Sequence, residues 1–148
     1  MNTIEGVLGD ATLFLKKVFA ALKKDNINVS EYELDHICYR VDMVERYNEL
    51  KQEILNYGSL LSESQIGGRA ISTFKLNEPI IFENREIRCI ELPSPKEGSF
   101  YPEGYEHVEF VIALEFEKFI SLYSHISFSR PFPGKLFIGS DLYCRIHL

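Results

Sequence analysis

The feature that most constrains the fold is an internal repeat, because the second half of the chain restarts the pattern of the first. Asp35-His36-Ile37 is echoed by Glu106-His107-Val108, and Ile90-Glu91-Leu92 is echoed by Ile146-His147-Leu148. The echoed positions lie 55 residues apart in the first half (36 to 91) and 40 apart in the second (107 to 147). A repeat of this kind indicates two copies of one supersecondary unit, the second copy being shorter by 15 residues.

The apolar pattern of the first half predicts the order β-α-β-β-β. Residues 34–41 alternate between apolar and polar, as a strand does, whereas residues 42–57 place apolar side chains at helical steps. Asp42 is a candidate N-cap for that helix, and Gly58 a candidate stop. Apolar runs at 59–66, 69–76 and 86–92 predict three strands, separated by the Gly67-Gly68 turn and an Asn77-Glu78-Pro79 break.

The second half repeats this order in compressed form, and a helix precedes both halves. Residues 105–114 predict a strand, 115–125 a helix, and short strands flank 131–134 before a final strand at 141–148. Residues 7–22 form an amphipathic pattern. We therefore expect one α+β domain with an N-terminal helical extension (1–33), a first βαβββ module (34–92), a linker (93–104) and a shortened second βαβββ module (105–148).

Charge and cysteine usage exclude several classes of function. Sixteen basic and 22 acidic residues give a net charge of −6, so we expect neither nucleic acid nor an anionic membrane as a partner. The sequence has no apolar run long enough for a membrane span and no secretory signal at its start. Three widely spaced cysteines favour thiols over disulfides, which predicts a cytoplasmic protein.

The alternation within the strands places four side chains of metal-binding type on the more polar faces. In the predicted strands the side chains of His36 and Ile37 point to opposite faces, and so do those of Glu91 and Ile90. His107 and His147 likewise point away from the apolar face of their strands. A single such residue in a sheet is more often hydrogen-bonded than metal-bound, but four in one phase at repeated positions point to a shared site. Three imidazoles and a carboxylate suit a first-row divalent metal. The predicted ligands are His36, Glu91, His107 and His147.

Further polar residues share this phase. Glu109, two residues after His107, is the candidate general base; its alternative roles are to support a ligand or to pair with an arginine. Cys38 and Cys89 also lie on this side, where buried core thiols are more common than metal ligands. Four cations on the same faces predict a small anionic ligand, unless they pair with carboxylates of the protein; they are Arg40, Arg69, Lys75 and Arg145.

The segments DHICYR, GGRAISTFKL, IELPSP and EGYEHVEF strongly resemble the YecM-like family of the vicinal oxygen chelate superfamily. The likeness runs from about residue 7 to the C-terminus. The superfamily includes glyoxalase I, methylmalonyl-CoA epimerase, extradiol dioxygenases and bleomycin-resistance proteins. The resemblance implies two βαβββ modules in a curved mixed sheet, with metal ligands on the first and last strands of each module. The matching positions are again His36, Glu91, His107 and His147.

The resemblance and the residues together imply a divalent-metal-dependent enzyme, with zinc, nickel, manganese or iron as the metal. The expected reaction on a small anionic substrate is isomerisation or epimerisation through a metal-stabilised enolate, with Glu109 moving a proton. A binding module that sequesters a small molecule without turnover is the main alternative, and an interaction protein is a third. The expected assembly is a monomer or a homodimer.

Overall fold

The computed structural model describes residues 3–130, 135–138 and 144–147. These residues form two compact units, one of residues 3–12 and His36–Glu106, the other of Leu13–Asp35 and residues 107–147. No helix within the described part of the chain is both long and apolar enough to cross a bilayer. The elements in chain order are α1 (Glu5–Leu8), α2 (Thr12–Lys24), β1 (Glu33–Arg40), α3 (Val44–Ile54), β2 (Gly58–Ile66), β3 (Arg69–Phe82), β4 (Arg85–Pro93), β5 (Gly104–Val111), α4 (Phe116–Leu122), β6 (Phe128–Ser129), β7 (Lys135–Ile138) and β8 (Cys144–His147).

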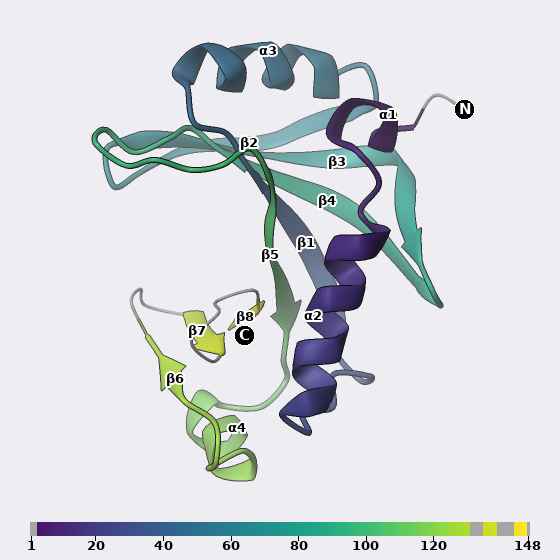
Figure 1. The fold of residues 1–148 in the computed structure, drawn as a ribbon, viewed down its shortest axis with the longest axis vertical. Coiled ribbons are helices and arrows are strands. Elements are labelled where there is room, and N and C mark those ends of the chain that lie inside the picture. Colours follow the sequence, from purple (N-terminus) through teal and green to yellow (C-terminus); the bar gives the residue numbers. More distant parts are fainter. Residues whose placement is uncertain (1–2, 131–134, 139–143, 148) are drawn as a thin grey trace. The chain divides into compact units, whose positions relative to one another are not determined.

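The strands of the first unit lie in the order β2-β3-β4-β1. β1 is parallel to β4, whereas β2 and β4 are both antiparallel to β3. The chain therefore leaves β1, passes through α3 and returns along a three-strand meander to pair with β1. Figure 1 shows α3 lying along one side of β2 and β3. This path is the βαβββ module expected from the sequence.

The second unit repeats the same path with shorter elements. Its strands lie in the order β5-β8-β7-β6, with β5 parallel to β8 and the other pairs antiparallel. Helix α4 follows β5 as α3 follows β1. The duplication and the mixed α+β architecture predicted from the sequence are thus confirmed.

The first unit has one apolar sheet face and one polar face. Phe74 pairs with Ile90, and both are completely buried on the side of α3. Tyr47 of α3 fixes that side, because its hydroxyl lies 2.6 Å from Oγ of Ser72. Since side chains alternate across a strand, the partner of Thr73, Glu91, lies on the opposite face.

The second unit has the same two-faced construction. Phe110 of β5 packs edge-on against Phe19 of α2, with ring centroids 6.1 Å apart. Phe110 pairs with Ile146, which is also completely buried, so this face is apolar. Burying one such aromatic or branched side chain stabilises a fold by about 1.5–3 kcal/mol. Glu109 and His147 belong to the other face.

The structure confirms the Gly67-Gly68 hairpin. The two glycines have φ angles of 61° and 81°, and Ile66 pairs directly with Arg69. Two consecutive positive φ angles are the requirement of a type I′ turn, which glycine meets without strain. The turn fixes the first residue of β3, and therefore the position of Arg69.

Three local predictions are wrong. The expected helix over 7–22 is two helices separated by residues 9–11, and Gly9, with a φ of 92°, is the C-cap of α1. Met43 rather than Asp42 is the N-cap of α3, and it makes no side-chain capping bond. β3 continues through the expected break at 77–79 because the register shifts between Lys75 and Ile80, and a bulge tolerates a proline that donates no ladder bond. Residues 141–143 of the expected last strand lie outside the described residues.

Candidate functional site

The first pair of candidate ligands, His36 and Glu91, comes from β1 and β4. The parallel register pairs Cys38 with Glu91, so His36 stands two residues earlier on the same face. Nε2 of His36 lies 3.3 Å from Oε2 of Glu91, and only 8% and 14% of the two side chains are exposed. Two ligand atoms at 2.0–2.2 Å from one ion are separated by about 2.8–3.6 Å. The pair therefore fits two coordination positions of one divalent cation.

The second pair, Glu109 and His147, stands at the corresponding place in the second unit. The register of β5 and β8 pairs Val111 with His147, so Glu109 stands two residues earlier on the same face. Oε2 of Glu109 lies 2.6 Å from Nδ1 of His147. This separation is shorter than that of two ligand atoms on one ion. By register, Glu109 rather than His107 occupies the place that His36 has in the first unit.

Lys135 completes the group around Glu109, and the sequence analysis missed it. Lys135 pairs with His147 in the register of β7 and β8. Its Nζ lies 3.1 Å from Oε1 of Glu109, whose side chain is only 3% exposed. Both carboxylate oxygens of Glu109 are thus engaged, one by an ammonium group and one by an imidazole. Three consecutive apolar residues follow Lys135, so the sequence pattern alone does not place its side chain on either face.

The remaining predicted ligand, His107, is completely buried on β5, two residues before Glu109. Residues two apart on a strand share a face, so His107 faces the same side as Glu109. Cys38 and Cys89 lie on the polar face of the first unit, where Cys38 is completely buried. Burial, and next the nearby carboxylate of Glu109, raise the pKa of the Cys144 thiol. Cys144 therefore stays protonated at neutral pH.

The predicted cations Arg40 and Arg145 each have a contact within their own unit. Nε of Arg40 lies 2.7 Å from Oε2 of Glu106, a partner that the sequence analysis did not assign. Burial lowers the pKa of Arg40, but Cys38 and Glu106 outweigh this and raise it, so the guanidinium stays charged. The Arg145 guanidinium lies 4.0 Å from the ring centroid of Phe137.

The other two predicted cations lie on β3. Lys75 is exposed and pairs with Cys89 in the register of β3 and β4, which places it on the polar face. Arg69 stands at the hairpin end of the strand, and its Nη1 donates to the backbone carbonyl of Ser94 at 3.3 Å. Neither makes an ion pair with a carboxylate among the residues that the structure describes.

Comparison with known proteins identifies relatives in both sequence and structure. The protein family described as YecM protein matches residues 3–133. An uncharacterized protein of Haemophilus influenzae is 34% identical over 111 residues, which cover 75% of this chain and 58% of that protein. Protein YecM of Escherichia coli K12 is 29% identical over 112 residues, which cover 76% and 60% of the two chains. The chain thus spans less than two-thirds of the length of these relatives.

Solved structures share the fold. The structural-genomics protein EC4020 superimposes with a TM-score of 0.77 at 27% identity, covering 90% of this chain and 81% of that one. Methylmalonyl-CoA epimerase in complex with methylmalonyl-CoA and NH4+ superimposes with a TM-score of 0.53 at 14% identity, covering 78% and 92%. A Streptomyces coelicolor methylmalonyl-CoA epimerase variant gives 0.54 at 13% identity, covering 77% and 94%. These epimerases show that the fold is of the vicinal oxygen chelate type.

Proposed function

The chain belongs to the YecM protein family, and from that premise we propose that it is a divalent-metal-dependent enzyme of the vicinal oxygen chelate type. The proposed reaction is isomerisation or epimerisation of a small anionic substrate. A cytoplasmic location remains a prediction from the sequence. The observation that carries the proposal is the pair His36 and Glu91, whose ligand atoms lie 3.3 Å apart on the polar face of the first unit.

The proposed metal ligands are His36, Glu91, His107 and His147. Imidazole nitrogen and carboxylate oxygen together suit zinc, nickel, manganese or iron. The first three side chains are shielded from water, since His36 is 6% exposed, His107 is completely buried and the Glu91 side chain is 14% exposed. A metal bound to this set would act as a Lewis acid toward the oxygen atoms of a substrate.

The protein itself supplies the proton chemistry through Glu109. We assign to its carboxylate the removal and return of a proton at a carbon next to a carbonyl group. Its side chain is 3% exposed, so bulk water does not compete for the proton. Lys135 and His147 hold the two carboxylate oxygens and so orient them. Lys135 is therefore a positioning residue for Glu109.

Two features favour an anionic substrate. Lys75 is exposed on the polar face of the first unit, and Arg145 pairs with Glu109 in the register of the second. Because the whole chain has a net charge of −6, an anion needs local cations of this kind to bind. We propose Lys75 and Arg145 as its contacts, whereas Arg40 is already paired with Glu106.

Hydrogen exchange into deuterated water tests the proposal. The protein, loaded in turn with zinc, nickel, manganese and ferrous iron, is incubated with 2-substituted carboxylic acids and acyl thioesters, and deuterium at the carbon next to the carbonyl is followed by NMR. We expect exchange with at least one metal, and a fall of about 100-fold or more in its rate for Glu109→Gln. A matched control is Glu117→Gln, which changes an exposed carboxylate of α4 that pairs with Arg130.

The second candidate function is sequestration of a small molecule without turnover. The observation in its favour is that both oxygens of Glu109 are already engaged, as in a purely structural ion pair. In that case no compound of the panel exchanges its proton, and Glu109→Gln binds small anions as tightly as the unsubstituted protein does. The exchange experiment and a binding titration therefore separate the two functions.

A further inference from the structure

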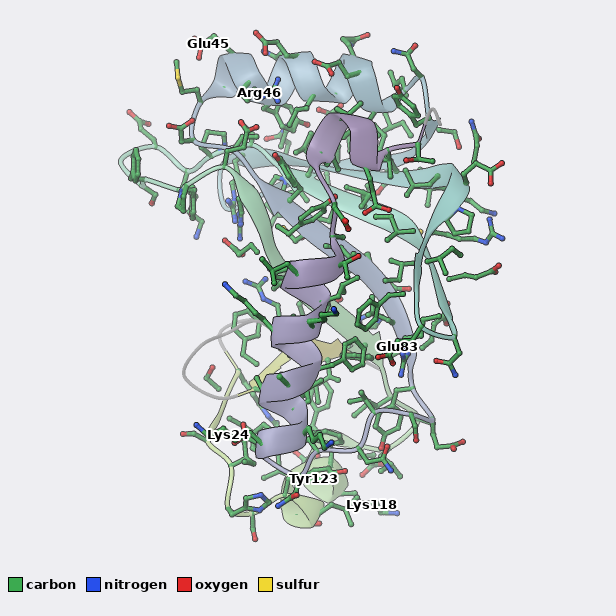
Figure 2. The ribbon with its side chains drawn as sticks, turned by 45° about the vertical axis from the view of Figure 1, so that its right-hand side comes forward. Lys24, Glu45, Arg46, Glu83, Lys118 and Tyr123 are labelled. Carbon is green, nitrogen blue, oxygen red and sulfur yellow. The ribbon has the colours of Figure 1, made fainter. Side chains whose placement is uncertain are left out.

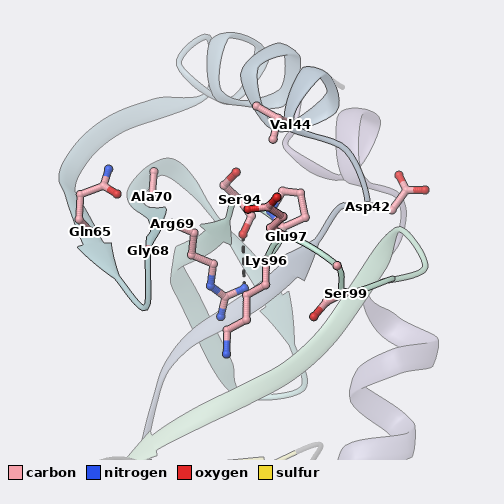
Figure 3. A pocket seen from close by; sticks show the side chains of 12 residues that line it. Asp42, Val44, Gln65, Gly68, Arg69, Ala70, Ser94, Lys96, Glu97 and Ser99 are labelled. Atoms are coloured by element: carbon pink, nitrogen blue, oxygen red, sulfur yellow. Dashed lines mark hydrogen bonds between the residues drawn. The ribbon is translucent and has the colours of Figure 1, made fainter.

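A cleft of about 540 Å³ lies in the first unit (Figure 3), a size typical of sites that hold small molecules. The hairpin end of β2 and β3, the loop before α3 and the segment after β4 form its walls. Arg69 stands four residues along β3 from Thr73, the partner of Glu91. At 3.4 Å per residue this is about 14 Å, and neither His36 nor Glu91 lines the cleft, so the cleft is separate from that pair.

The backbone holds this cleft in a defined shape. The type I′ turn at Gly67-Gly68 fixes one wall. On the other, the Ser94 amide donates to the carbonyl of Ala70 at 2.8 Å, and the Ser99 amide donates to the carbonyl of Lys96 at 3.1 Å. The second bond closes a four-residue turn in which Gly98 has a φ of 76°, the conformation that type II turns require. The side chain of Lys96 is therefore carried by a closed turn.

Two cations, Arg69 and Lys96, line the cleft. Figure 3 shows the side chains of Arg69 and Lys96 extending in the same direction. Among the described residues, no carboxylate forms an ion pair with either of them. This contrasts with Arg40, Arg46 and Arg130, each of which pairs with a glutamate. Two cations directed into one cleft repel each other, and an anion bound between them would offset that repulsion.

Arg69 also has a buried donor that no described acceptor satisfies. Its Nη1 donates to the Ser94 carbonyl at 3.3 Å, which orients the guanidinium group. Its Nε is buried and has no hydrogen-bond partner among the residues that the structure describes. Buried donors in native proteins are nearly always paired, so this nitrogen is suited to an acceptor supplied from outside the protein.

Asp42 and Glu97 are the acidic residues that line the cleft. Figure 3 shows the Asp42 side chain turned away from Arg69. Glu97 follows Lys96 in the same exposed turn, and its carboxylate lies in the middle of the view. Its charge opposes any anion in the cleft. Lys96 and Glu97 are therefore adjacent, exposed residues whose charges act on such a ligand with opposite sign.

We propose that this cleft binds an oxyanion, the phosphate or carboxylate group of a small molecule, with Arg69 and Lys96 as its cationic contacts. A guanidinium group presents its donors in a planar fork that matches either group. The proposal does not rest on the metal site, since it uses none of the predicted metal ligands.

Titration of metal-stripped protein tests the proposal, because removal of metal prevents anions from binding to an ion instead. Inorganic pyrophosphate and succinate are added separately at low ionic strength, and backbone amide resonances are followed by NMR. We expect saturable shifts confined to residues 67–70 and 94–99, with a dissociation constant in the micromolar to millimolar range. The tighter of the two probes identifies the phosphate or the carboxylate as the ligand group.

Charge variants decide whether the cleft is responsible. Lys96→Gln and Arg69→Gln each weaken binding about tenfold, whereas Glu97→Gln strengthens it. Arg88→Gln, an exposed cation of β4 paired with Glu86, leaves it unchanged. Lys96 is exposed, so its variant reports on binding even if Arg69→Gln fails to fold. Absence of shifts with both probes, or an equal effect of Lys96→Gln and Arg88→Gln, overturns the proposal.

Discussion

Nδ1 of His147 lies 2.6 Å from Oε2 of Glu109, and this pair repeats the His36–Glu91 pair of the first unit with the two residue types exchanged between the strands. In the first unit Glu91 pairs in register with Cys38, two residues after His36. In the second unit His147 pairs in register with Val111, two residues after Glu109. A histidine leads in the first unit and a glutamate leads in the second. The duplicated fold thus preserves an imidazole–carboxylate contact while it exchanges the residue types.

Lys135 should stabilise the second unit through Glu109. Lys135→Met removes the ammonium group 3.1 Å from Oε1 of a buried carboxylate. We expect the free energy of unfolding to fall by about 3 kcal/mol, the lower end of the usual cost of removing one partner of a buried ion pair. Urea unfolding followed by circular dichroism measures it, with the exposed Lys118→Gln on α4 (Figure 2) as the control. Equal stability of the two variants would show that Lys135 does not hold Glu109.

Tyr47 should anchor α3 to the sheet of the first unit. Its hydroxyl lies 2.6 Å from Oγ of the completely buried Ser72 and donates to Oε1 of Glu63 at 2.9 Å. Tyr47→Phe leaves the Ser72 hydroxyl with one partner fewer, so we expect a loss of about 1–2 kcal/mol in unfolding free energy. Tyr57→Phe, which changes a less buried tyrosine, serves as the reference. The double variant with Ser72→Ala should recover part of the loss, and no recovery would argue against this pair.

Stability should fall at alkaline pH because of Tyr39. Burial, and next the carboxylate of Glu103, raise the pKa of Tyr39 from its ordinary value of 10.0 to about 12. The folded state therefore holds the proton more tightly than the unfolded state does. This contribution is complete below pH 10 and is lost as the pH rises toward 12. Tyr39→Phe should flatten that decline in unfolding experiments, and a decline of unchanged slope would contradict the assignment.

Arg46, which also contacts Glu103, provides the control for the Tyr39 prediction. Arg46 on α3 (Figure 2) donates to both oxygens of Glu103, the carboxylate that also accepts from Tyr39. Arg46→Gln retains the phenol of Tyr39 but removes a cation that lowers its pKa. Tyrosinate absorbance of this variant should therefore appear at a pH no lower than in the unsubstituted protein, since Arg46 lowers the pKa of Tyr39.

The cysteines should differ in reactivity. The Cys144 thiol is buried, and burial and Glu109 raise its pKa, so little of the reactive thiolate forms. We expect iodoacetamide to modify the half-buried Cys89 first and to leave Cys144 unmodified in the folded protein. Peptide mass spectrometry after timed quenching reads out each site, and denaturation should equalise them. Early alkylation of Cys144 in folded protein would contradict its burial.

The repeat was predictable because apolar and polar residues alternate along each strand and because the segment around His36 is similar to the segment around His107. Four strands, a helix after the first of them and the Gly67-Gly68 turn suffice to define the βαβββ path of the first unit. What alternation does not contain is the register between strands. The echo equates His36 with His107, whereas the strand pairing equates His36 with Glu109, two residues later. Because residues two apart on a strand point to the same face of the sheet, the apolar–polar alternation cannot reveal this difference in register.

The partners of charged side chains were also beyond the sequence. Glu106 beside Arg40 and Lys135 beside Glu109 are separated in sequence by 66 and 26 positions, so only the folded chain pairs them. Lys96 lies in a turn-rich segment whose composition predicts a loop but not which cation it faces. The bulge that carries β3 past Pro79 depends likewise on its neighbours. Strand identity is local, whereas ion pairing and bulges are tertiary.

The central claim is that four side chains of this chain bind one divalent metal ion, and metal content tests it most directly. Protein purified without an affinity tag is loaded with metal, dialysed and measured by inductively coupled plasma mass spectrometry. The account predicts one equivalent of zinc, nickel, manganese or iron per chain, lost in His36→Gln, Glu91→Gln, His107→Gln and His147→Gln and retained in His125→Gln. A chain that binds none of these metals, or four variants that bind as well as His125→Gln, would contradict it.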